Sequence, residues 1–125
     1  MNKEAVIQMC QAYGIHPRQS LGQNFLCNSS VAKSIVSLCL GTRNTSVLEI
    51  GPGIGAITEI LCDRFDRVTV VEIDQRLTPV LEDRFAYCSH FKLIRGDYLK
   101  CARNLLLDSN EVPDAVVSNL PYYVT

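Results

Sequence analysis

The sequence predicts an α/β fold, in which a parallel β-sheet is wound with helices on its faces. Three observations predict it. From Ser46 onward, short apolar runs alternate with segments of helical periodicity. The run Arg67–Glu72 has apolar residues at successive positions, as expected of a strand buried on both faces. The glycine-rich segment Gly51–Gly55 follows the first apolar run and precedes a helical pattern, so that strand, loop and helix succeed one another.

Length and composition fit one modest domain. The chain has 125 residues, of which 47% are hydrophobic, so it can fill a core. Its net charge of −1 gives no global basic field that would attract nucleic acid, although residues 1–43 carry +3 and the remainder −4. This asymmetry weakly favours an anionic partner at the N-terminal side.

The six cysteines predict neither a disulfide framework nor a metal site, because no Cys-x-x-Cys pair occurs. Most stand in apolar surroundings, and we expect them to be reduced, buried small hydrophobes. No apolar run is long enough to span a membrane, and we expect no secretory leader. The sequence therefore predicts a cytoplasmic protein without a membrane or metal partner.

Two helices are expected before the sheet. The first spans Lys3–Tyr13 and ends at Gly14 in a left-handed cap. Its apolar face is expected at Val6, Met9, Cys10 and Tyr13. The second spans Asn28–Leu40 and ends at Gly41. Its apolar stripe is expected at Val31, Ile35, Leu38 and Cys39. The loop between them, residues 20–26, could hold a ligand's polar edge or could be ordinary packing.

Four strands with intervening helices are expected from residue 46 on. The strands are Val47–Ile50, Arg67–Glu72, Phe91–Ile94 and Asp114–Ser118. Ala56–Leu61 fits a first crossover helix. Thr78 suits the N-cap and Pro79 the first turn of a second, whose inward residues are expected at Val80, Leu81 and Phe85. Asn104–Leu107 is expected to belong to a third. Crossovers of this kind are right-handed.

A nucleoside site is expected at the first two strand ends. Gly51, Gly53 and Ala56 satisfy the loose Gly-x-Gly-x-x-Gly/Ala pattern, and Glu72 lies 21 residues beyond Gly51. An acidic side chain at this place can accept hydrogen bonds from both ribose hydroxyls. Glycines let the backbone approach a ligand without a clashing Cβ.

Two further carboxylates bear on which ligand binds. Glu49 stands two residues before Gly51, and an anion there disfavours a pyrophosphate. It favours a ligand that is positively charged near the loop, such as the sulfonium and amino group of S-adenosylmethionine. Asp97, at the third strand end, is placed to accept a hydrogen bond from an adenine amine, or else to cap a turn or helix.

The segment Asn119–Tyr122 follows the fourth strand directly, and ligands of open α/β sheets bind beyond such carboxyl ends. Asn119 could accept a hydrogen bond from an amine, while Tyr122 stacks on the face of a planar ring. The alternative is a strand followed by a Pro121 turn with a half-buried tyrosine.

With these motifs together, the chain resembles the N-terminal part of the ribosomal RNA adenine dimethyltransferases of the small subunit. The motifs that carry the resemblance, in the family's order, are Leu21–Leu26, Glu49–Gly53, Val71–Asp74, Gly96-Asp97 and Asn119–Tyr122. Leu21-Gly22 resembles these enzymes more than the antibiotic-resistance methylases of large-subunit RNA. The final residues 123–125 depart from the Asn-Ile-Ser form that is common in the family.

The resemblance implies a Rossmann-like S-adenosylmethionine-dependent methyltransferase fold, truncated after the fourth strand. It implies cofactor-binding roles for Asn24, Leu26, Glu49, Gly51, Gly53, Glu72, Asp97 and Asn119. It implies catalytic roles for Asn119, Pro121 and Tyr122. The implied reaction is direct transfer of the sulfonium methyl group to the N6 amine of adenine, twice, in small-subunit ribosomal RNA or a pre-30S particle.

The resemblance also implies a domain organisation. Residues 1–45 would form a helical extension whose loop covers the cofactor, and residues 46–125 a partial methyltransferase domain that lacks the family's C-terminal RNA-binding helical domain. Such a fragment would bind the cofactor, methylate RNA weakly or not at all, and self-associate through an open sheet edge. Other readings are a large-subunit methylase, a nicotinamide-dependent oxidoreductase and a non-catalytic RNA-binding relative.

Overall fold

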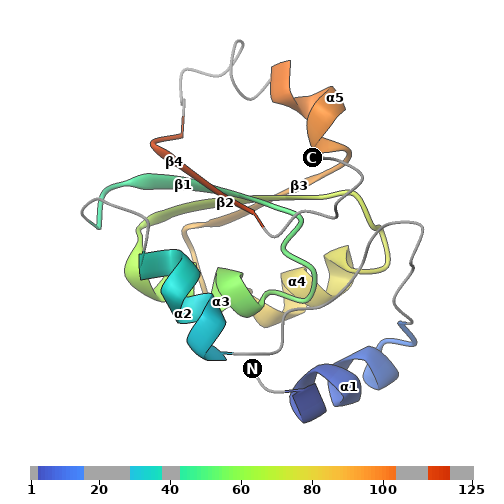
Figure 1. Ribbon diagram of the computed structural model, residues 1–125. Helices are drawn as coiled ribbons and strands as arrows, with labels where there is room; N and C mark the ends of the chain where they lie inside the picture. Colours follow the sequence, from blue (N-terminus) through green and yellow to red (C-terminus); the bar gives the residue numbers. More distant parts are fainter. Residues whose placement is uncertain (1–2, 16–28, 38–42, 104–112, 119–125) are drawn as a thin grey trace.

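A computed structural model describes residues 3–15, 29–37, 43–103 and 113–118 of the chain (Figure 1). Its elements are, in order, α1 (Lys3–Ala12), α2 (Ser29–Ser37), β1 (Ser46–Ile50), α3 (Ala56–Arg64), β2 (Arg67–Glu72), α4 (Thr78–Arg84), β3 (Phe91–Arg95), α5 (Tyr98–Arg103) and β4 (Ala115–Ser118). The alternation of strands and helices confirms the α/β fold predicted from the sequence.

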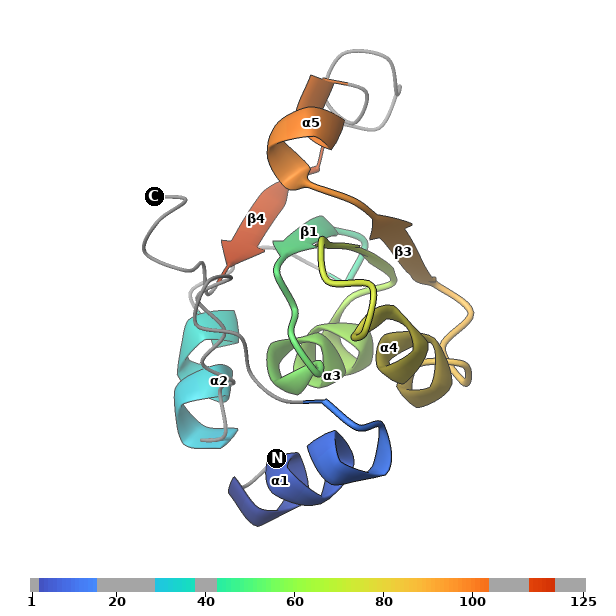
Figure 2. The ribbon, with the colours of Figure 1, turned by 90° about the vertical axis from the view of Figure 1, so that its right-hand side faces the viewer.

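The strands form one parallel sheet in the order β3-β2-β1-β4. From β1 the chain adds β2 and then β3 on one side of β1. The connection from β3 then crosses over, and β4 is added on the other side of β1. The direction of winding therefore reverses, and the reversal point lies between β1 and β4. Helices α1–α4 lie on one face of the sheet and α5 on the other, as the two views agree (Figures 1 and 2). Because crossovers are right-handed, a reversal in the direction in which strands are added moves the next helix, α5, to the opposite face of the sheet. All four strands therefore point their carboxyl ends to one edge of the sheet, beside the reversal point.

Both faces of the central strands β1 and β2 are largely buried, which explains their uninterrupted apolar runs. On the face toward α3, Val47, Val68 and Val70 join a core with helix residues such as Leu61 and Leu81. On the opposite face, a smaller cluster consists of Leu48, Ile50 and Val71, with Ile94 and Tyr98 packed against it. Strand residues alternate between these clusters, so sequence neighbours point to opposite faces.

Helix α1 packs against the loops at the carboxyl edge through Val6 and Cys10, which form a cluster with Ile54, Leu77 and Val80. Gly14 has φ +63°, as predicted for the helix end. The prediction that Tyr13 belongs to the buried face is wrong, because Tyr13 is exposed and its hydroxyl donates to Asp83 Oδ2 at 2.7 Å. A tyrosine at the helix end is stabilised more by a hydrogen bond to a solvent-exposed carboxylate than by burial of its hydroxyl.

Among the described residues, the predicted apolar stripe of α2 is wrong at Val31 and confirmed at Ile35. Val31 is 43% exposed, whereas Ala32 and Val36 are fully buried and Ile35 packs beside them. Leu38 and Cys39, also assigned to that stripe, lie outside the described residues. The face of α2 that carries Ala32 points inward, because the small Ala32 side chain lets α2 pack closely on α3.

Two helix starts differ from the prediction. Leu77, not Thr78, is the N-cap of α4, and Thr78 Oγ1 donates instead to the carbonyl of Gln75 at 3.1 Å. The inward residues Val80, Leu81 and Phe85 are buried as predicted. Helix α5 begins at Tyr98, directly after Asp97, earlier than the helix predicted around residues 104–107, which lie outside the described residues.

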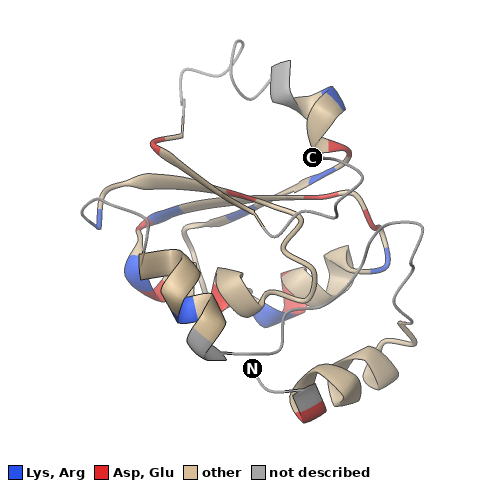
Figure 3. Cartoon of the chain, in the orientation of Figure 1, with Lys and Arg blue, Asp and Glu red and all other residues tan. Residues whose placement is uncertain are grey.

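The four cysteines that the structure describes are buried or half-buried, as predicted for most of them. Cys10, Cys62 and Cys88 are buried and Cys101 half-buried, all as free thiols, while residues 27 and 39 lie outside the described ranges. Within those ranges no His, Cys, Asp and Glu cluster could hold a metal ion, and no helix is long and apolar enough to cross a membrane. Lys and Arg are interspersed with Asp and Glu on the helices beneath the sheet (Figure 3).

Candidate functional site

The loop between β1 and α3 has a backbone that only glycine adopts readily. Gly51, Gly53 and Gly55 have φ values of +67°, +62° and +99°. The N–H of Gly51 donates to the carbonyl of Val71 at 2.9 Å, which continues the parallel ladder one residue beyond β1. A Cβ added at Gly51 would meet no atom within 4 Å, so a ligand could approach the backbone there.

Gly55 was missed by the Gly51, Gly53 and Ala56 pattern, although it is the most constrained glycine of the loop. A Cβ there would lie 2.7 Å from Cε2 of Phe85 and 2.9 Å from Nη1 of Arg84. The same Arg84 guanidinium donates to the carbonyl of Ile54. Gly55 therefore lets the loop lie directly on α4. The signal for it was the third glycine of the segment.

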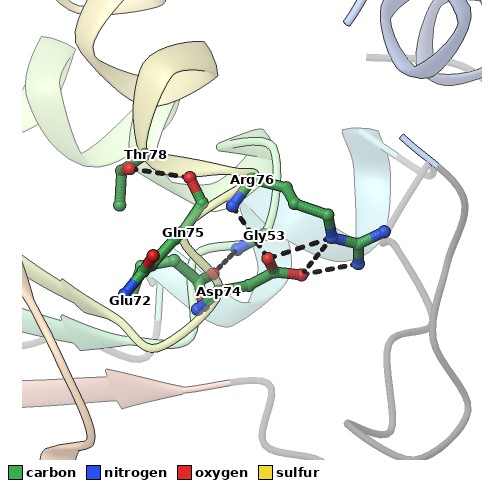
Figure 4. Close-up of polar contacts among 6 residues, drawn as sticks. All are labelled: Gly53, Glu72, Asp74, Gln75, Arg76 and Thr78. Atoms are coloured by element: carbon green, nitrogen blue, oxygen red, sulfur yellow. Dashed lines mark hydrogen bonds and ion pairs between the residues drawn. The ribbon is translucent and has the colours of Figure 1, made fainter. Parts of the chain in front are cut away.

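Glu72 stands at the end of β2, buried, with both carboxylate oxygens in hydrogen bonds from the backbone. Oε1 accepts from the N–H of Gly53 at 3.1 Å, and Oε2 accepts from the N–H of Asp74 at 3.0 Å (Figure 4). The carboxylate thus joins the glycine loop to the segment after β2. A carboxylate has about four acceptor sites, so Glu72 can accept a further hydrogen bond from a ligand.

The turn that follows Glu72 is held by Asp74. Its Oδ1 accepts from the backbone N–H of Arg76 at 2.9 Å, and its Oδ2 accepts from Nη2 of the same residue at 2.7 Å (Figure 4). Asp74 is buried and Arg76 is partly exposed, so this charge-assisted pair lies at the border between the interior and water. Between the two acids, Ile73 is 49% exposed at the carboxyl edge of the sheet. An exposed isoleucine there offers an apolar face, and no pattern in the sequence indicates its exposure.

Glu49 is buried on the α3 face of the sheet, where the hydroxyl of Thr58 donates to its Oε1. Glu49 pairs in register with Val70, so Glu72 lies two residues farther along the neighbouring strand and on the same face. Burial raises the pKa of Glu49 to about 8, with the negative charge of Glu72 adding to the rise and the Thr58 hydrogen bond opposing it. Thr58 was also missed. Its signal was a hydroxyl among the apolar residues of the buried helix face.

The pKa of Glu72 is raised as well, first by burial, against the opposing hydrogen bonds from the Asp74 and Gly53 backbone. Among the described residues, no Lys, Arg or His forms an ion pair with Glu49 or Glu72. Buried carboxylates without a facing cation are costly, because charges inside proteins are usually paired. The two side chains thus suit a ligand that brings positive charge and ribose hydroxyls.

Asp97 occupies the helix-capping role that the sequence left open. Its Oδ1 accepts from the N–H of Leu99 at 2.9 Å, at the start of α5. The N–H of the preceding Gly96 donates to the carbonyl of Glu72 at 2.9 Å, so the ends of β2 and β3 stay side by side. Within the described part of the chain, no residue donates to Oδ2 of Asp97.

The remaining predicted site residues, Asn24, Leu26, Asn119, Pro121 and Tyr122, lie outside the described residues. Ser118 is the last described residue of β4. It pairs with Ile50, and its hydroxyl donates to the Ile50 carbonyl at 3.0 Å. The structure therefore brings together Glu49, Gly51, Gly53, Glu72 and Asp97 at neighbouring strand ends. It does not test the part of the site beyond β4.

Fold and site together define a Rossmann-like α/β protein with a nucleoside-type site, and solved structures share this fold. The crystal structure of the 23S rRNA methyltransferase ErmE is 30% identical, with a TM-score of 0.62 over 76% of this chain and 36% of that one. A dimethyladenosine transferase from Plasmodium falciparum is 23% identical, with a TM-score of 0.66 over 82% of this chain and 35% of that one. The fold is therefore that of the Rossmann-like methyltransferases.

The family model described as ribosomal RNA adenine dimethylase matches residues 15–125, and the chain belongs to that family. Ribosomal RNA small subunit methyltransferase A from Listeria monocytogenes is 41% identical over 122 residues, and that from Bacillus licheniformis 44% over 123. Each alignment covers 94% of this chain and 41% of the relative. The chain thus spans about two fifths of the length of these relatives.

Proposed function

We propose that the chain binds S-adenosylmethionine at the carboxyl ends of β1, β2 and β3 and serves N6-dimethylation of adenines in small-subunit ribosomal RNA. The observation that carries the proposal is the Glu72 carboxylate, which is fixed by the Gly53 and Asp74 amides. It lies beside a glycine loop and a second buried acid without a described cation. This combination fits a nucleoside with a positively charged substituent.

Each described site residue binds a different part of the cofactor. Glu72 accepts from the ribose hydroxyls through its remaining lone pairs. The open space above Gly51 admits the ligand's chain close to the backbone. The exposed side chain of Ile73 offers the purine an apolar face, and Oδ2 of Asp97 accepts from the purine amine. We assign to Asn24 and Leu26, which lie outside the described residues, the role of covering the cofactor.

The charge of the site favours this cofactor over a dinucleotide. A pyrophosphate would bring its negative charge beside Glu49 and Glu72, which already raise one another's cost of ionisation. A sulfonium cation lowers that cost. Thr58 keeps the Glu49 carboxyl in one orientation, so the negative potential is directed by a fixed group rather than by a mobile side chain.

When bound, the cofactor supplies an electrophilic methyl group. The chain's own contribution to transfer is to hold the acceptor amine. Asn119 accepts a hydrogen bond from N6 and favours the tetrahedral nitrogen of the transition state, an effect worth about 3 kcal/mol. Tyr122 stacks on the base turned out of the RNA, worth roughly 1–3 kcal/mol, and Pro121 keeps the turn between them rigid.

Small-subunit RNA, alone or in a pre-30S particle in the cytoplasm, is the substrate that we infer. The relatives named for small-subunit methylation are 41–44% identical to the chain, whereas the 23S rRNA enzyme ErmE is 30% identical. Leu21-Gly22 supports the same choice. Large-subunit RNA is the second candidate, carried by the likeness to ErmE.

Transfer of labelled methyl from S-adenosylmethionine tests this proposal. The chain, in excess over undermethylated small subunits, is expected to place label only weakly, and in N6-methylated adenosines, resolved by nuclease digestion and chromatography. Asn119→Ala is expected to remove transfer while leaving cofactor affinity nearly intact. Label in large-subunit RNA or in another base, or unchanged transfer by Asn119→Ala, would contradict the proposal.

A further inference from the structure

Ribose binding by Glu72 does not explain why a second acid, Glu49, is buried beside it. It is 1% exposed, on the α3 face of β1 and close to a second acid. The groups that face it are Thr58 and Cys62 from α3 and Glu72 from β2. None of these is a cation. The carboxylate of Glu49 therefore has one neutral donor and one negatively charged neighbour among the described residues.

In such surroundings, the charge of Glu49 depends on what the site contains. With no cation nearby, burial favours the neutral carboxyl, and the pKa of about 8 leaves it largely protonated at pH 7. A cation in the site favours the carboxylate by the same electrostatic argument. The Thr58 hydroxyl stabilises the ionised form through its hydrogen bond, so it sets how readily the proton leaves.

The donor and product of methyl transfer differ in this charge. Before transfer the cofactor carries a sulfonium, and afterwards it is a neutral thioether, while its ammonium, carboxylate, ribose and adenine stay the same. We propose, resting on the function inferred above, that Glu49 distinguishes the sulfonium donor from the thioether product by releasing its proton to solvent when the donor binds. Once the sulfonium has become a thioether, its contribution to stabilising the carboxylate is lost, and Glu49 takes up protons from solvent to a corresponding extent.

This inference assigns a specificity role to Glu49 and a positioning role to Thr58. The Glu49 carboxylate attracts the positively charged sulfonium of the donor and not the neutral thioether of the product, so the site prefers donor over product by an amount that grows as Glu49 ionises more easily. The preference should therefore rise with pH below about 8, by at most about tenfold per pH unit, and level off above it. Glu72, bonded to two amides, serves both ligands alike.

Calorimetry with the intact chain measures this directly. S-adenosylmethionine and S-adenosylhomocysteine are titrated at pH 7 in phosphate and in Tris, whose ionisation enthalpies differ, so that the protons released per ligand bound are obtained. The two ligands share their ammonium and carboxylate, and the difference between them isolates the sulfonium. We expect the donor to release at least half a proton more than the product.

The variants identify the group responsible. Glu49→Gln is neutral and nearly isosteric, and it should abolish the difference in released protons. Glu4→Gln, at an exposed position on α1, should keep it. Thr58→Val should weaken donor binding at pH 7 by about tenfold relative to product, and Thr58→Ser should restore it. The serine rescue distinguishes a lost hydrogen bond from a repacked helix.

The outcomes separate the two proposals. Equal proton release by donor and product, or an unchanged difference in Glu49→Gln, would overturn this role of Glu49 while leaving cofactor binding in place. If the wild-type chain bound neither ligand, the proposed function would fail as well. If Glu49→Gln unfolded, the pH dependence of the donor-to-product affinity ratio in wild type and in the Thr58 pair would still decide.

Discussion

Oε1 of Glu72 accepts a hydrogen bond from the backbone N–H of Gly53 at 3.1 Å, across the gap between two strand ends. This contact couples the glycine loop after β1 to the acid after β2. Both parts are required for a nucleoside site in a Rossmann-like fold. The site is thus preorganised by main-chain geometry, and changes to the loop backbone should affect binding and stability separately.

Gly51→Ala should impair cofactor binding far more than stability. The new Cβ meets no protein atom, so the cost to folding is the left-handed backbone alone, about 1–2 kcal/mol. In the complex, the same Cβ would occupy the space through which the cofactor approaches. Gly14→Ala is the matched control, because its φ of +63° and open surroundings give the same strain outside the glycine loop. Calorimetric binding and urea unfolding of both variants check this. Equal affinities would contradict it.

Gly55→Ala should be more destabilising than Gly14→Ala. Its φ is +99°, and the added Cβ would lie 2.7 Å from the ring of Phe85, which is buried and cannot move aside cheaply. Overpacking of this kind costs about 1–3 kcal/mol in addition to the backbone strain. The midpoint of urea unfolding measures the difference between the two variants. Equal midpoints would show that α4 and the loop are not in the contact described.

The stability of the chain should fall as pH rises from about 4.5 to about 8. The folded chain keeps the Glu49 proton up to a pKa of about 8, while the unfolded chain releases it near the ordinary value of 4.5. Unfolding therefore releases a proton within this range, and the free energy of unfolding decreases by up to about 1.4 kcal/mol per pH unit. Above pH 8 this contribution is constant.

Urea unfolding between pH 5 and pH 9 measures that slope. Glu49→Gln should flatten the profile and gain stability relative to wild type as pH rises, whereas Glu4→Gln should run parallel to wild type. A residual slope of the same sign is expected from Glu72, whose pKa is also raised by burial. Identical profiles for wild type and Glu49→Gln would show that Glu49 ionises normally in the folded chain.

The chain should self-associate through β4. Among the described strands β4 pairs only with β1, and Val116 on it is 53% exposed. Unpaired backbone groups beside an exposed apolar residue favour pairing with another chain. Sedimentation velocity at increasing concentration should show a dimer or larger species, and Val116→Lys should shift the distribution toward monomer. A wild-type monomer at high concentration would contradict the prediction.

The sequence predicts the sheet well because strands buried on both faces leave a continuous apolar run, as in β2. It predicts helix faces less well. In α2, Val31 and Ala32 both begin plausible stripes, and only the packing against α3 selects Ala32. The start of α5 was missed because Asp97 was considered as a ligand group or cap without a helix following it directly.

In the site, too, some features can be predicted from the sequence and others depend on tertiary contacts. Glycines and acids at strand ends are visible in the sequence, since their spacing from the strands is fixed. Thr58 and Gly55 act through contacts with Glu49 and Phe85 that bring together residues from different elements, and their importance depends on distances that no spacing rule contains. Ile73 was read as part of a motif, but its exposure beside Glu72 required the structure.

Titration of S-adenosylmethionine and NAD into wild-type chain and Glu72→Gln tests the central claim most directly. The account predicts that wild type binds S-adenosylmethionine and not NAD. It predicts that Glu72→Gln weakens that binding by about 10- to 100-fold, the worth of hydrogen bonds to a charged group. Thermal unfolding of the variant provides the check that its fold is intact. Tighter binding of NAD, or undiminished binding of S-adenosylmethionine by a folded Glu72→Gln, would contradict the account.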